Sequence, residues 1–315
     1  MTKTGVSAGP VVYRKPGLLR SYWKYRSLVL LFVPAVLYYV LFKYLPIYGV
    51  QIAFKKYMFL KGIWGSPWVG FSNFEKLIGM ASFWEVLRNT FIISGLKLLF
   101  GFPAPIILAL LLNELRGVAF KRVVQTISYL PHFLSWVILS GIFIQFLSPS
   151  IGPINIAIKA MGGKPIYFLG SESWFRPVLV FTHVWKSVGW GTIVYLAALT
   201  GINPEFYEAA HIDGATRWQR MRYITLPSLA PVITIMLIFA VGGVIEDDFS
   251  QIYNMYNEAV YSVGDVISTY TYRRGLVKMD YGFASAVDLF KNLVALVLIV
   301  LANTVANRVN EYGIW

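Results

Sequence analysis

Residue types that could carry covalent chemistry are few and scattered in this sequence. The chain of 315 residues has no Cys and three His, which lie far apart at His132, His183 and His211. Without Cys there can be no disulfide, thiolate metal site or Cys nucleophile, and the separation of the His residues gives no argument for a metal site. The chain also lacks a Gly-x-x-x-x-Gly-Lys-Ser/Thr loop, a His-Glu-x-x-His pair and a nucleophile elbow. It is therefore not an ATPase itself, and we expect its polar side chains to act by binding.

Ionisable residues within apolar segments are the first candidates for such binding, because a charge inside a membrane is costly and usually functional. Lys97, Lys186, Asp288 and Lys291 lie in or near apolar segments. A cavity that contained Lys97 and Lys186 would suit an anionic ligand, although a Lys side chain can also snorkel to the membrane surface. Asp288 and Lys291 are three positions apart, so they form either a helical pair or two snorkelling groups.

Aromatic residues in the same segments suit sugars, since Tyr and Trp offer both an apolar face and a hydrogen-bonding group. Interface anchoring and ordinary packing explain many of these residues equally well. The aromatic candidates for a substrate path are Trp136, Trp190 and Tyr195.

The composition predicts that these residues belong to a multi-pass membrane protein. Hydrophobic residues make up 57% of the chain and charged residues 14%, whereas about a quarter of the residues of a soluble domain are charged. A span needs about 20 mostly apolar residues. We therefore expect an all-α integral membrane protein with six transmembrane helices, near 28–50, 89–112, 124–147, 177–199, 228–245 and 286–306.

The distribution of Lys and Arg predicts how the chain is oriented. A basic cytoplasmic arm, 1–27, precedes an uncleaved first span, and the loops 113–123 and 200–226 carry further basic residues. Both termini are thus expected in the cytoplasm, with 28–315 as the membrane domain. Although the net charge is +13, the basic residues flank apolar runs, so nucleic-acid binding is not expected. Most acidic residues lie in the expected outer loops 51–88, 148–176 and 246–285.

The loop between the fourth and fifth expected spans, 203–227, is predicted to form a short helical hairpin at the membrane surface. Asn203 is suited to cap the first helix, which begins with a Pro. Gly214 is expected to end that helix, because Gly adopts the left-handed conformation at low cost. A second helical stretch, 215–225, follows, and we expect the loop's final Leu-Pro pair to stop it and to start the fifth span.

This hairpin resembles the EAA loop of binding-protein-dependent ABC importer permeases. The family pattern is Glu-Ala-Ala, three residues, Gly, nine residues and Ile-x-Leu-Pro, and this chain follows it without a gap. The resemblance implies that the hairpin is the coupling helix of a type I importer permease and inserts into a cleft of an ATPase subunit. The residues to which it assigns this coupling are Glu208, Ala209, Ala210, Asp213, Gly214, Leu226 and Pro227.

The same resemblance implies a multi-subunit assembly in the bacterial inner membrane. The chain would pair with a second, homologous permease, two ATPase subunits that bind ATP and Mg, and an extracytoplasmic solute-binding protein. Membrane lipid would surround it, and it would hold no cofactor of its own. Closure of the ATPase subunits would drive alternating access.

Further segments indicate the substrate. Residues 68–74 and 88–90 look like sugar-importer permeases. Residues 253–257, 264–270 and the terminal Trp315 look like the branch named for lipoprotein and polysaccharide transport, which includes uronate-oligomer importers and the larger permease subunit of bacterial alginate importers. The implied substrate is an acidic oligosaccharide such as an alginate oligomer.

Three alternatives stay open at this point. The solute could be a neutral oligosaccharide or another small molecule. A secondary transporter or channel would need no ATPase, but it leaves the EAA pattern unexplained. A membrane-embedded enzyme, such as a glycosyltransferase, would need paired acids or a metal cluster within the spans, where Asp288 is the acidic residue that lies deep in a span.

Overall fold

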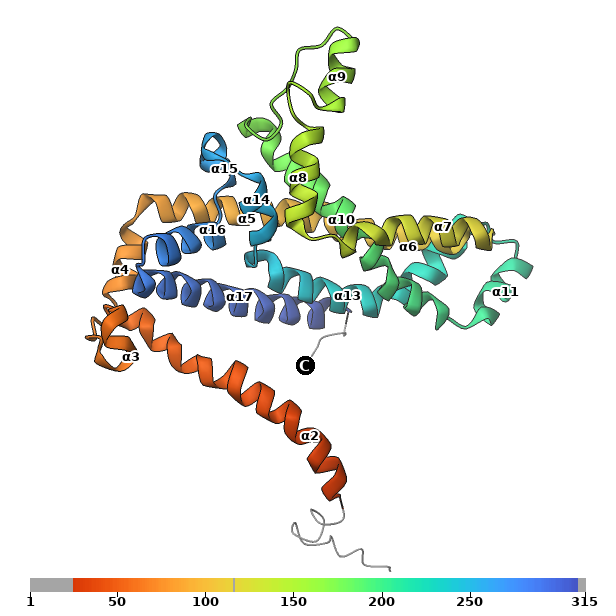
Figure 1. Ribbon diagram of the computed structural model, residues 1–315. Helices are drawn as coiled ribbons and strands as arrows, with labels where there is room; N and C mark the ends of the chain where they lie inside the picture. Colours follow the sequence, from red (N-terminus) through yellow and green to blue (C-terminus); the bar gives the residue numbers. More distant parts are fainter. Residues whose placement is uncertain (1–24, 116, 311–315) are drawn as a thin grey trace, which may run out of the picture. The chain divides into compact units, whose positions relative to one another are not determined.

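The computed structural model describes residues 25–115 and 117–310, and these residues are almost entirely helical (Figure 1). In this part of the chain, an isolated antiparallel bridge between Lys55 and Trp68 is the only β-type pairing. The expected all-α fold is therefore confirmed. Most of the expected basic arm, together with Arg116 and Trp315, lies outside the described residues.

The described residues fall into two compact units, which are divided between Gln51 and Ile52. In the first unit no residue of α2 is buried, and apolar side chains cover the helix on all sides. A helix that is apolar all round is suited to a lipid environment. Lipid offers no hydrogen-bond partners for backbone N–H and C=O groups, and a helix satisfies these groups internally. The unit consists of α2 (Arg26–Tyr39), a π turn (Val40–Tyr44) and the start of a 3-10 turn (Leu45–Phe54).

The second unit begins with short helices that are tied to the preceding loop by polar side chains. Asn73 donates from Nδ2 to the carbonyl oxygens of Ala53 at 2.8 Å and Lys55 at 3.1 Å. The buried Lys55 donates from Nζ to the Ile63 carbonyl at 2.6 Å. These helices are α3 (Gly62–Gly65) and α4 (Ser72–Gly79).

A long helical run follows, made of α5 (Ala81–Gly101) and α6 (Pro103–Glu114). Pro103 does not break this run, because it occupies the first turn of α6, where its missing N–H costs nothing. The backbone N–H of Phe102 still bonds to the Leu98 carbonyl. The helical run therefore continues past this proline.

The third expected span, 124–147, is not one straight helix. Two helical segments, 118–133 and 136–146, meet at an angle of 103°. The break follows Pro131, and Ser135 starts the new helix by accepting a hydrogen bond from Ile138 N. The elements are α7 (Val118–Tyr129), a 3-10 turn (Leu130–Phe133) and α8 (Trp136–Phe146).

The central helix of the unit is α10 (Glu172–Thr200), which packs against α5, α6, α7 and α13. It follows the outer helix α9 (Pro153–Ala160). At Gly189 the backbone of α10 approaches the backbone of Ser128 and Tyr129 so closely that a Cβ atom would overlap with it. A Gly at this position therefore allows α10 to cross α7 in direct contact.

The remaining helices run from the hairpin back through the unit. The segment 246–248 leaves the fifth span and is tied to its surroundings, because Asp247 Oδ2 accepts from Ser268 N at 3.1 Å. The last helix packs along α13. The elements are α11 (Pro204–Ile212), α12 (Arg217–Arg220), α13 (Leu226–Gly242), α14 (Phe249–Met255), α15 (Tyr261–Gly264), α16 (Ile267–Tyr272) and α17 (Tyr281–Asn310).

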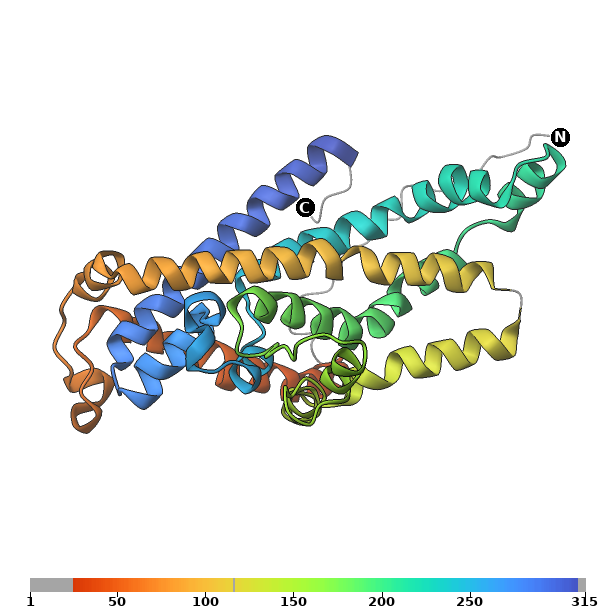
Figure 2. The same ribbon diagram turned by 90° about the horizontal axis from the view of Figure 1, so that it is seen from above.

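In this second unit, α11 and the loop between α6 and α7 lie at one end, whereas α4 and α16 lie at the other (Figures 1 and 2). The prediction that the loops 113–123 and 200–226 share one side of the membrane, opposite 51–88 and 246–285, requires this arrangement. Among the described residues, four helices are long and apolar enough to cross a membrane, or five if the bent pair counts as one span. α10 has 29 residues but is less apolar, since it carries charged and polar groups. The expectation of six spans is therefore not confirmed.

Candidate functional site

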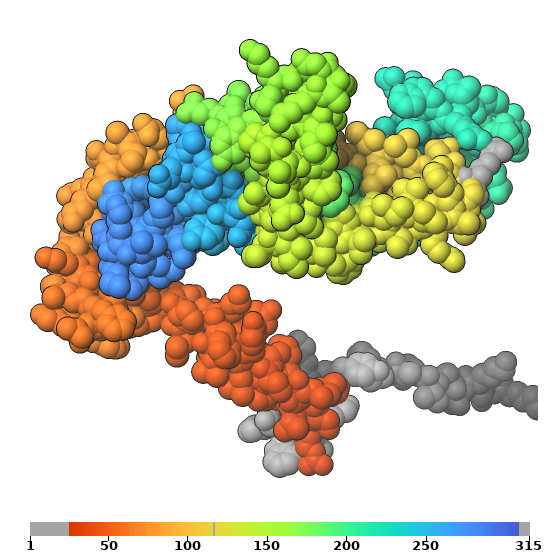
Figure 3. All heavy atoms as spheres, turned by 45° about the horizontal axis from the view of Figure 1, so that its top comes forward, coloured from red at the N-terminus to blue at the C-terminus, as the bar shows by residue number. Residues whose placement is uncertain are grey.

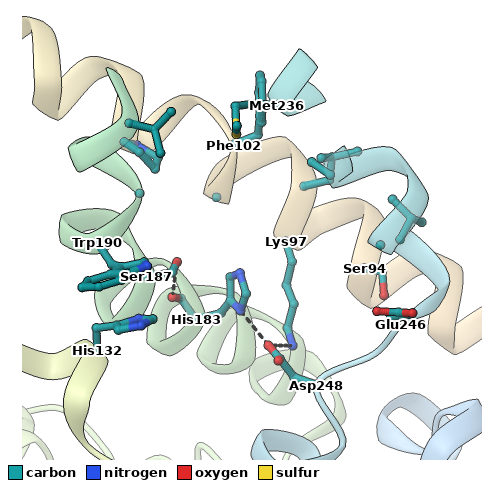
Figure 4. Close-up of a pocket in the computed structure, with 18 of the residues that line it drawn as sticks. Ser94, Lys97, Phe102, His132, His183, Ser187, Trp190, Met236, Glu246 and Asp248 are labelled. Atoms are coloured by element: carbon teal, nitrogen blue, oxygen red, sulfur yellow. Dashed lines mark hydrogen bonds and ion pairs between the residues drawn. The ribbon is translucent and has the colours of Figure 1, made fainter. Parts of the chain in front are cut away.

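A cavity of about 430 Å³ lies among α5, α6, α10 and α13, within the second unit (Figure 4). Its wall is mostly apolar, and its polar groups are concentrated where α5 and α10 face the segment 246–248. This volume falls within the range of small-molecule sites, about 300–1,000 Å³. The side chains with polar atoms that line it are Ser94, Lys97, His132, His183, Ser187, Trp190, Tyr195, Glu246 and Asp248.

Three of these side chains meet at one point. Lys97 Nζ lies 3.1 Å from Asp248 Oδ2, and His183 Nδ1 lies 2.8 Å from the same oxygen. Because a carboxylate only accepts hydrogen bonds, the His183 nitrogen that faces it carries the proton. Lys97 is 7% exposed, so its ammonium group needs a counter-charge.

The carboxyl group of Asp248 is held in its charged form. Burial raises its pKa, but the hydrogen bond from His183 and the positive charge of Lys97 outweigh this effect and bring the pKa below its usual value. Asp248 lies just beyond the fifth span, on the segment that joins α13 to α14. The cavity therefore contains a charged pair that the chain supplies from its own residues.

An aromatic wall stands beside this charged pair. The rings of His132 and Trp190 are stacked, with centroids 4.5 Å apart and planes only 1° from parallel. Phe133 meets the Trp190 ring edge-on at 5.7 Å. Because Trp190 also lines the cavity, the wall offers a flat face on which a sugar ring can stack.

Lys186, another predicted path residue, has a different environment. Its Nζ donates to three backbone carbonyls, those of Pro131 at 3.3 Å, His132 at 2.8 Å and Leu134 at 2.7 Å. It also lies 5.5 Å from the centre of the Trp136 ring. Helix carbonyls lose intrahelical partners where α7 breaks, although that of Pro131 also accepts from Leu134 N at 3.3 Å, so Lys186 caps the broken helix.

The structure thus separates the predicted path residues into three groups. Lys97, Trp190 and Tyr195 line the cavity. Lys186 and Trp136 do not line the cavity and lie together at the break between α7 and α8. Asp288 instead lines a second cavity of about 460 Å³, next to α16 and α17. Within the described residues, Asp288 and Lys291 do not form an ion pair.

Sequence reasoning missed Asp248 and His183, which complete the site around Lys97. The wide spacing of the three His residues along the chain gives no sign that His183 belongs to a site. Asp248 lies in an acidic run, Glu246-Asp247-Asp248, directly after the Gly-rich end of the fifth span. An acidic run at the end of an apolar segment was the signal available in the sequence.

The hairpin forms largely as expected. Asn203 caps α11 by accepting a hydrogen bond from Glu205 N at 3.0 Å, and Gly214 ends the helix with a φ of +76°. Thr216 and Gln219 form a capping box at the start of α12. Tyr207 then links the two arms through a 2.9 Å hydrogen bond to Thr225 Oγ1.

One prediction for the hairpin is wrong. Leu226 and Pro227 do not stop the second helix, which continues from Arg217 to Ile245 without a break. A π turn, Met221–Thr225, precedes them, and Pro227 falls in the first turn of the α-helix that follows. The wider turn and this position let the chain continue past the proline.

The hairpin exposes apolar side chains in place of burying them. α11 has no buried residue, and it projects with α12 as a lobe at one end of the second unit (Figure 3). Glu208 and Ala209 are exposed, and Ala210 is half-buried. Ile212 is 86% exposed and Trp218 is 66% exposed. An exposed apolar surface of this kind is typical of a protein-binding site.

Comparison with known proteins adds independent information. Residues 101–312 match the family described as "Binding-protein-dependent transport system inner membrane component". Protein LplB of Bacillus subtilis is 43% identical over 98% of this chain and 96% of that protein. The polygalacturonan/rhamnogalacturonan transport system permease protein YteP of Bacillus subtilis is 41% identical over 96% of this chain and 94% of its own length.

A solved structure is also similar to this one. It is a chain of a bacterial alginate ABC transporter in complex with an alginate pentasaccharide-bound periplasmic protein. The TM-score is 0.87 at 40% identity, and the match covers 94% of this chain and 99% of the other. At this identity and coverage the two chains share a fold over almost their whole length.

Proposed function

The chain belongs to the family of binding-protein-dependent transport system inner membrane components, and we propose that it forms the translocation path of an ATP-driven importer for acidic oligosaccharides. Members of this family are multi-pass permease subunits of ABC importers, so the chain is a sugar permease and not an enzyme. The single observation that carries the acidic substrate is Lys97, a buried ammonium group in the wall of the cavity.

The substrate path runs through this cavity. Lys97 and His183 supply positive charge or hydrogen-bond donors for a sugar carboxylate, and the stacked pair of His132 and Trp190 supplies a face for the sugar ring. Similarity over nearly the whole chain to proteins named for polygalacturonan and for alginate supports an acidic substrate. Fragments of alginate or of a related polyuronate are the ligands that we propose.

The hairpin transmits the work of the ATPase. We assign it to a cleft of an ATPase subunit, which binds ATP and Mg, because α11 is exposed and carries small residues beside Glu208. Small side chains allow a helix to enter a groove deeply, and an acidic residue fixes its register. Asp213, Gly214, Leu226 and Pro227 shape the turn and the connection to the fifth span.

The proposed assembly follows the family. The chain pairs with a second permease and two ATPase subunits in the bacterial inner membrane, with six spans and both termini in the cytoplasm. α10 and the bent pair of α7 and α8 provide the spans beyond the four most apolar helices. A solute-binding protein delivers the sugar at the end where α4 and α16 lie, and the complex of the alginate transporter with a periplasmic protein supports such a partner.

A neutral oligosaccharide is the second candidate substrate. The same cavity contains two carboxylates, Glu246 and Asp248, and carboxylates are good acceptors for sugar hydroxyl groups. With Asp248 paired to Lys97, the cavity as a whole has no excess of positive charge. This balance is the observation that favours a neutral sugar.

The two candidates can be separated with the complete importer in lipid nanodiscs. We expect trimannuronate or trigalacturonate, delivered by the binding protein, to stimulate ATP hydrolysis more than the same trisaccharides with their carboxylates reduced to alcohols. Stronger stimulation by the reduced sugars would instead favour the neutral candidate. Absence of stimulation by any saccharide would contradict both.

A further inference from the structure

Asp248 has an arrangement that simple pairing with Lys97 does not explain. We propose that Asp248 is an internal counter-ion, which occupies Lys97 and His183 in the empty cavity and is replaced there by a carboxylate of the transported sugar. This inference rests on the proposed function, because it requires an acidic substrate. It makes Asp248 a specificity-determining residue.

Lys97 and His183 together form a site for an anion, and the carboxylate of Asp248 occupies it. A single oxygen, Oδ2, accepts both the bond from Lys97 at 3.1 Å and the bond from His183 at 2.8 Å. A uronate carboxylate has the same charge and the same pair of oxygens, so it can make the same two bonds. Among the described residues, Asp248 is the only hydrogen-bond partner of Lys97 Nζ.

The environment of Lys97 favours such an exchange. An unpaired ammonium group is costly to bury, and Lys97 is buried in the C-terminal part of α5. We therefore expect Asp248 to leave Lys97 when another carboxylate takes its place, and to return when that carboxylate departs. When Asp248 returns, it would compete with the sugar carboxylate for Lys97 and so promote release of the sugar.

Asp248 can move while its backbone stays fixed. Its neighbour Asp247 is held by Ser268 N, and Gln251 is held by Leu179 O and by Thr182 Oγ1, each at 2.8 Å. Asp248 itself is the N-cap residue of α14, yet its side chain makes no capping hydrogen bond. We expect a rotation of the side chain to bring the carboxylate toward the first turn of α14, where an N-cap Asp usually bonds.

A second ion pair in the same unit shows the contrast. Arg273 binds both oxygens of Asp265, at 2.8 and 2.5 Å, and Thr269 also donates to Asp265 at 2.7 Å. The Asp265 side chain is only 9% exposed, whereas that of Asp248 is 36% exposed and lines the cavity. Arg273–Asp265 is therefore a structural pair, and Asp265 provides a matched control.

The test measures direct binding of trimannuronate and of its carboxyl-reduced analogue to the purified permease–ATPase complex without nucleotide or binding protein. Asp248→Asn is expected to bind trimannuronate about tenfold more tightly than the wild type, because the competing charge is gone and close charge pairs are worth at least about 1.5 kcal/mol. Binding of the reduced sugar is expected to change by less than about twofold, a small fraction of that energy. Asp265→Asn is expected to leave the ratio between the two sugars unchanged.

The double variant Lys97→Gln/Asp248→Asn removes both charges and leaves no unpaired buried group, so it guards against a folding defect in the single variant. With His183 alone left to favour a carboxylate, its preference for trimannuronate should fall well below that of Asp248→Asn. Unchanged or weaker binding of trimannuronate to Asp248→Asn, or an acid preference in the double variant as strong as in Asp248→Asn, would overturn the counter-ion while leaving an acid-selective importer intact. If the wild type itself shows no preference for trimannuronate, both the counter-ion and the acidic substrate are wrong.

Discussion

The cavity and the hairpin differ in whether their candidate functional side chains are buried and paired within this chain. In the cavity, Lys97 is buried and paired with Asp248, a partner from the same chain. On the hairpin, Ile212 and Trp218 are apolar and exposed, without burial by this chain. The difference agrees with the two proposed roles, in which the cavity binds a ligand and the hairpin binds another protein. Variants in the two regions should therefore fail in different ways, and the following predictions use that difference.

The largest effect is expected from Glu208→Ala on the hairpin. Glu208 is exposed in this chain, so its removal should leave folding and membrane insertion intact. In the complete importer we expect a buried pair with a basic residue of the ATPase, and loss of one partner of such a pair costs about 3–5 kcal/mol. Uptake of the oligosaccharide should fall by roughly a hundredfold or more, at unchanged amounts of the protein in the membrane.

Glu205→Ala is the control for this variant, because Glu205 lies on the same helix and is also exposed. It interacts with the helix N-terminus and with Asn203, and such exposed interactions contribute about 1 kcal/mol or less. Uptake should therefore fall only a few-fold. Normal uptake by Glu208→Ala would remove the basis for assigning the hairpin to the ATPase.

The next effect concerns the cavity. Lys97→Gln removes the ammonium group that we assign to the sugar carboxylate, while the amide retains a hydrogen-bond donor. Uptake of trimannuronate should fall by about tenfold or more, in line with the energy of close charge pairs. Uptake of the carboxyl-reduced sugar should fall much less. Equal losses for both sugars would show that Lys97 supports the fold and does not select the charge.

Lys186→Met should lower the stability of the protein without changing its preference for the acidic sugar. Its Nζ donates to three carbonyls at the break after α7, and the loss of a donor to partly buried acceptors costs about 1–3 kcal/mol. We expect a lower melting temperature of the purified protein, measured by intrinsic fluorescence in nanodiscs, with the preference for acidic sugar unchanged. A changed preference at normal stability would place Lys186 in the substrate path after all.

The same comparison shows what the sequence could predict. The hairpin depends on neighbours in the chain, so its cap at Asn203 and its turn at Gly214 followed from local spacing. The cavity depends on groups that are distant in sequence. Lys97 and Asp248 are 151 positions apart, and His183 and Asp248 are 65 apart. Lys97 could be identified as a costly charge in an apolar segment. Its neighbours could not, because Asp248 and His183 reach it only when the segment 246–248 and α10 pack beside α5.

The break in the third span illustrates the same limit. Pro131 and Ser135 are signals of a helix end and a helix start, but hydropathy alone runs through both and predicts one span. The carbonyls that the break exposes are tolerated because Lys186, on a different helix, donates to them. Whether Pro131 and Ser135 break the helix therefore depends on a contact with Lys186, which hydropathy along the chain cannot predict.

The smallest predicted effect lies where the two regions join. Tyr207 on α11 and Thr225, one residue before α13, share a 2.9 Å hydrogen bond, which is a direct polar link between the hairpin and the fifth span. Tyr207→Phe removes this bond at nearly constant volume and should cost about 1 kcal/mol. If the link transmits movement, uptake should fall by about fivefold, while ATP hydrolysis without substrate changes less. Thr225→Val removes the same bond and a longer one of 3.4 Å to the Arg220 carbonyl, so it should lose at least as much, and the double variant should lose no more than Thr225→Val alone. Additive losses would show that the two residues act separately and that the hairpin moves the span through its backbone alone.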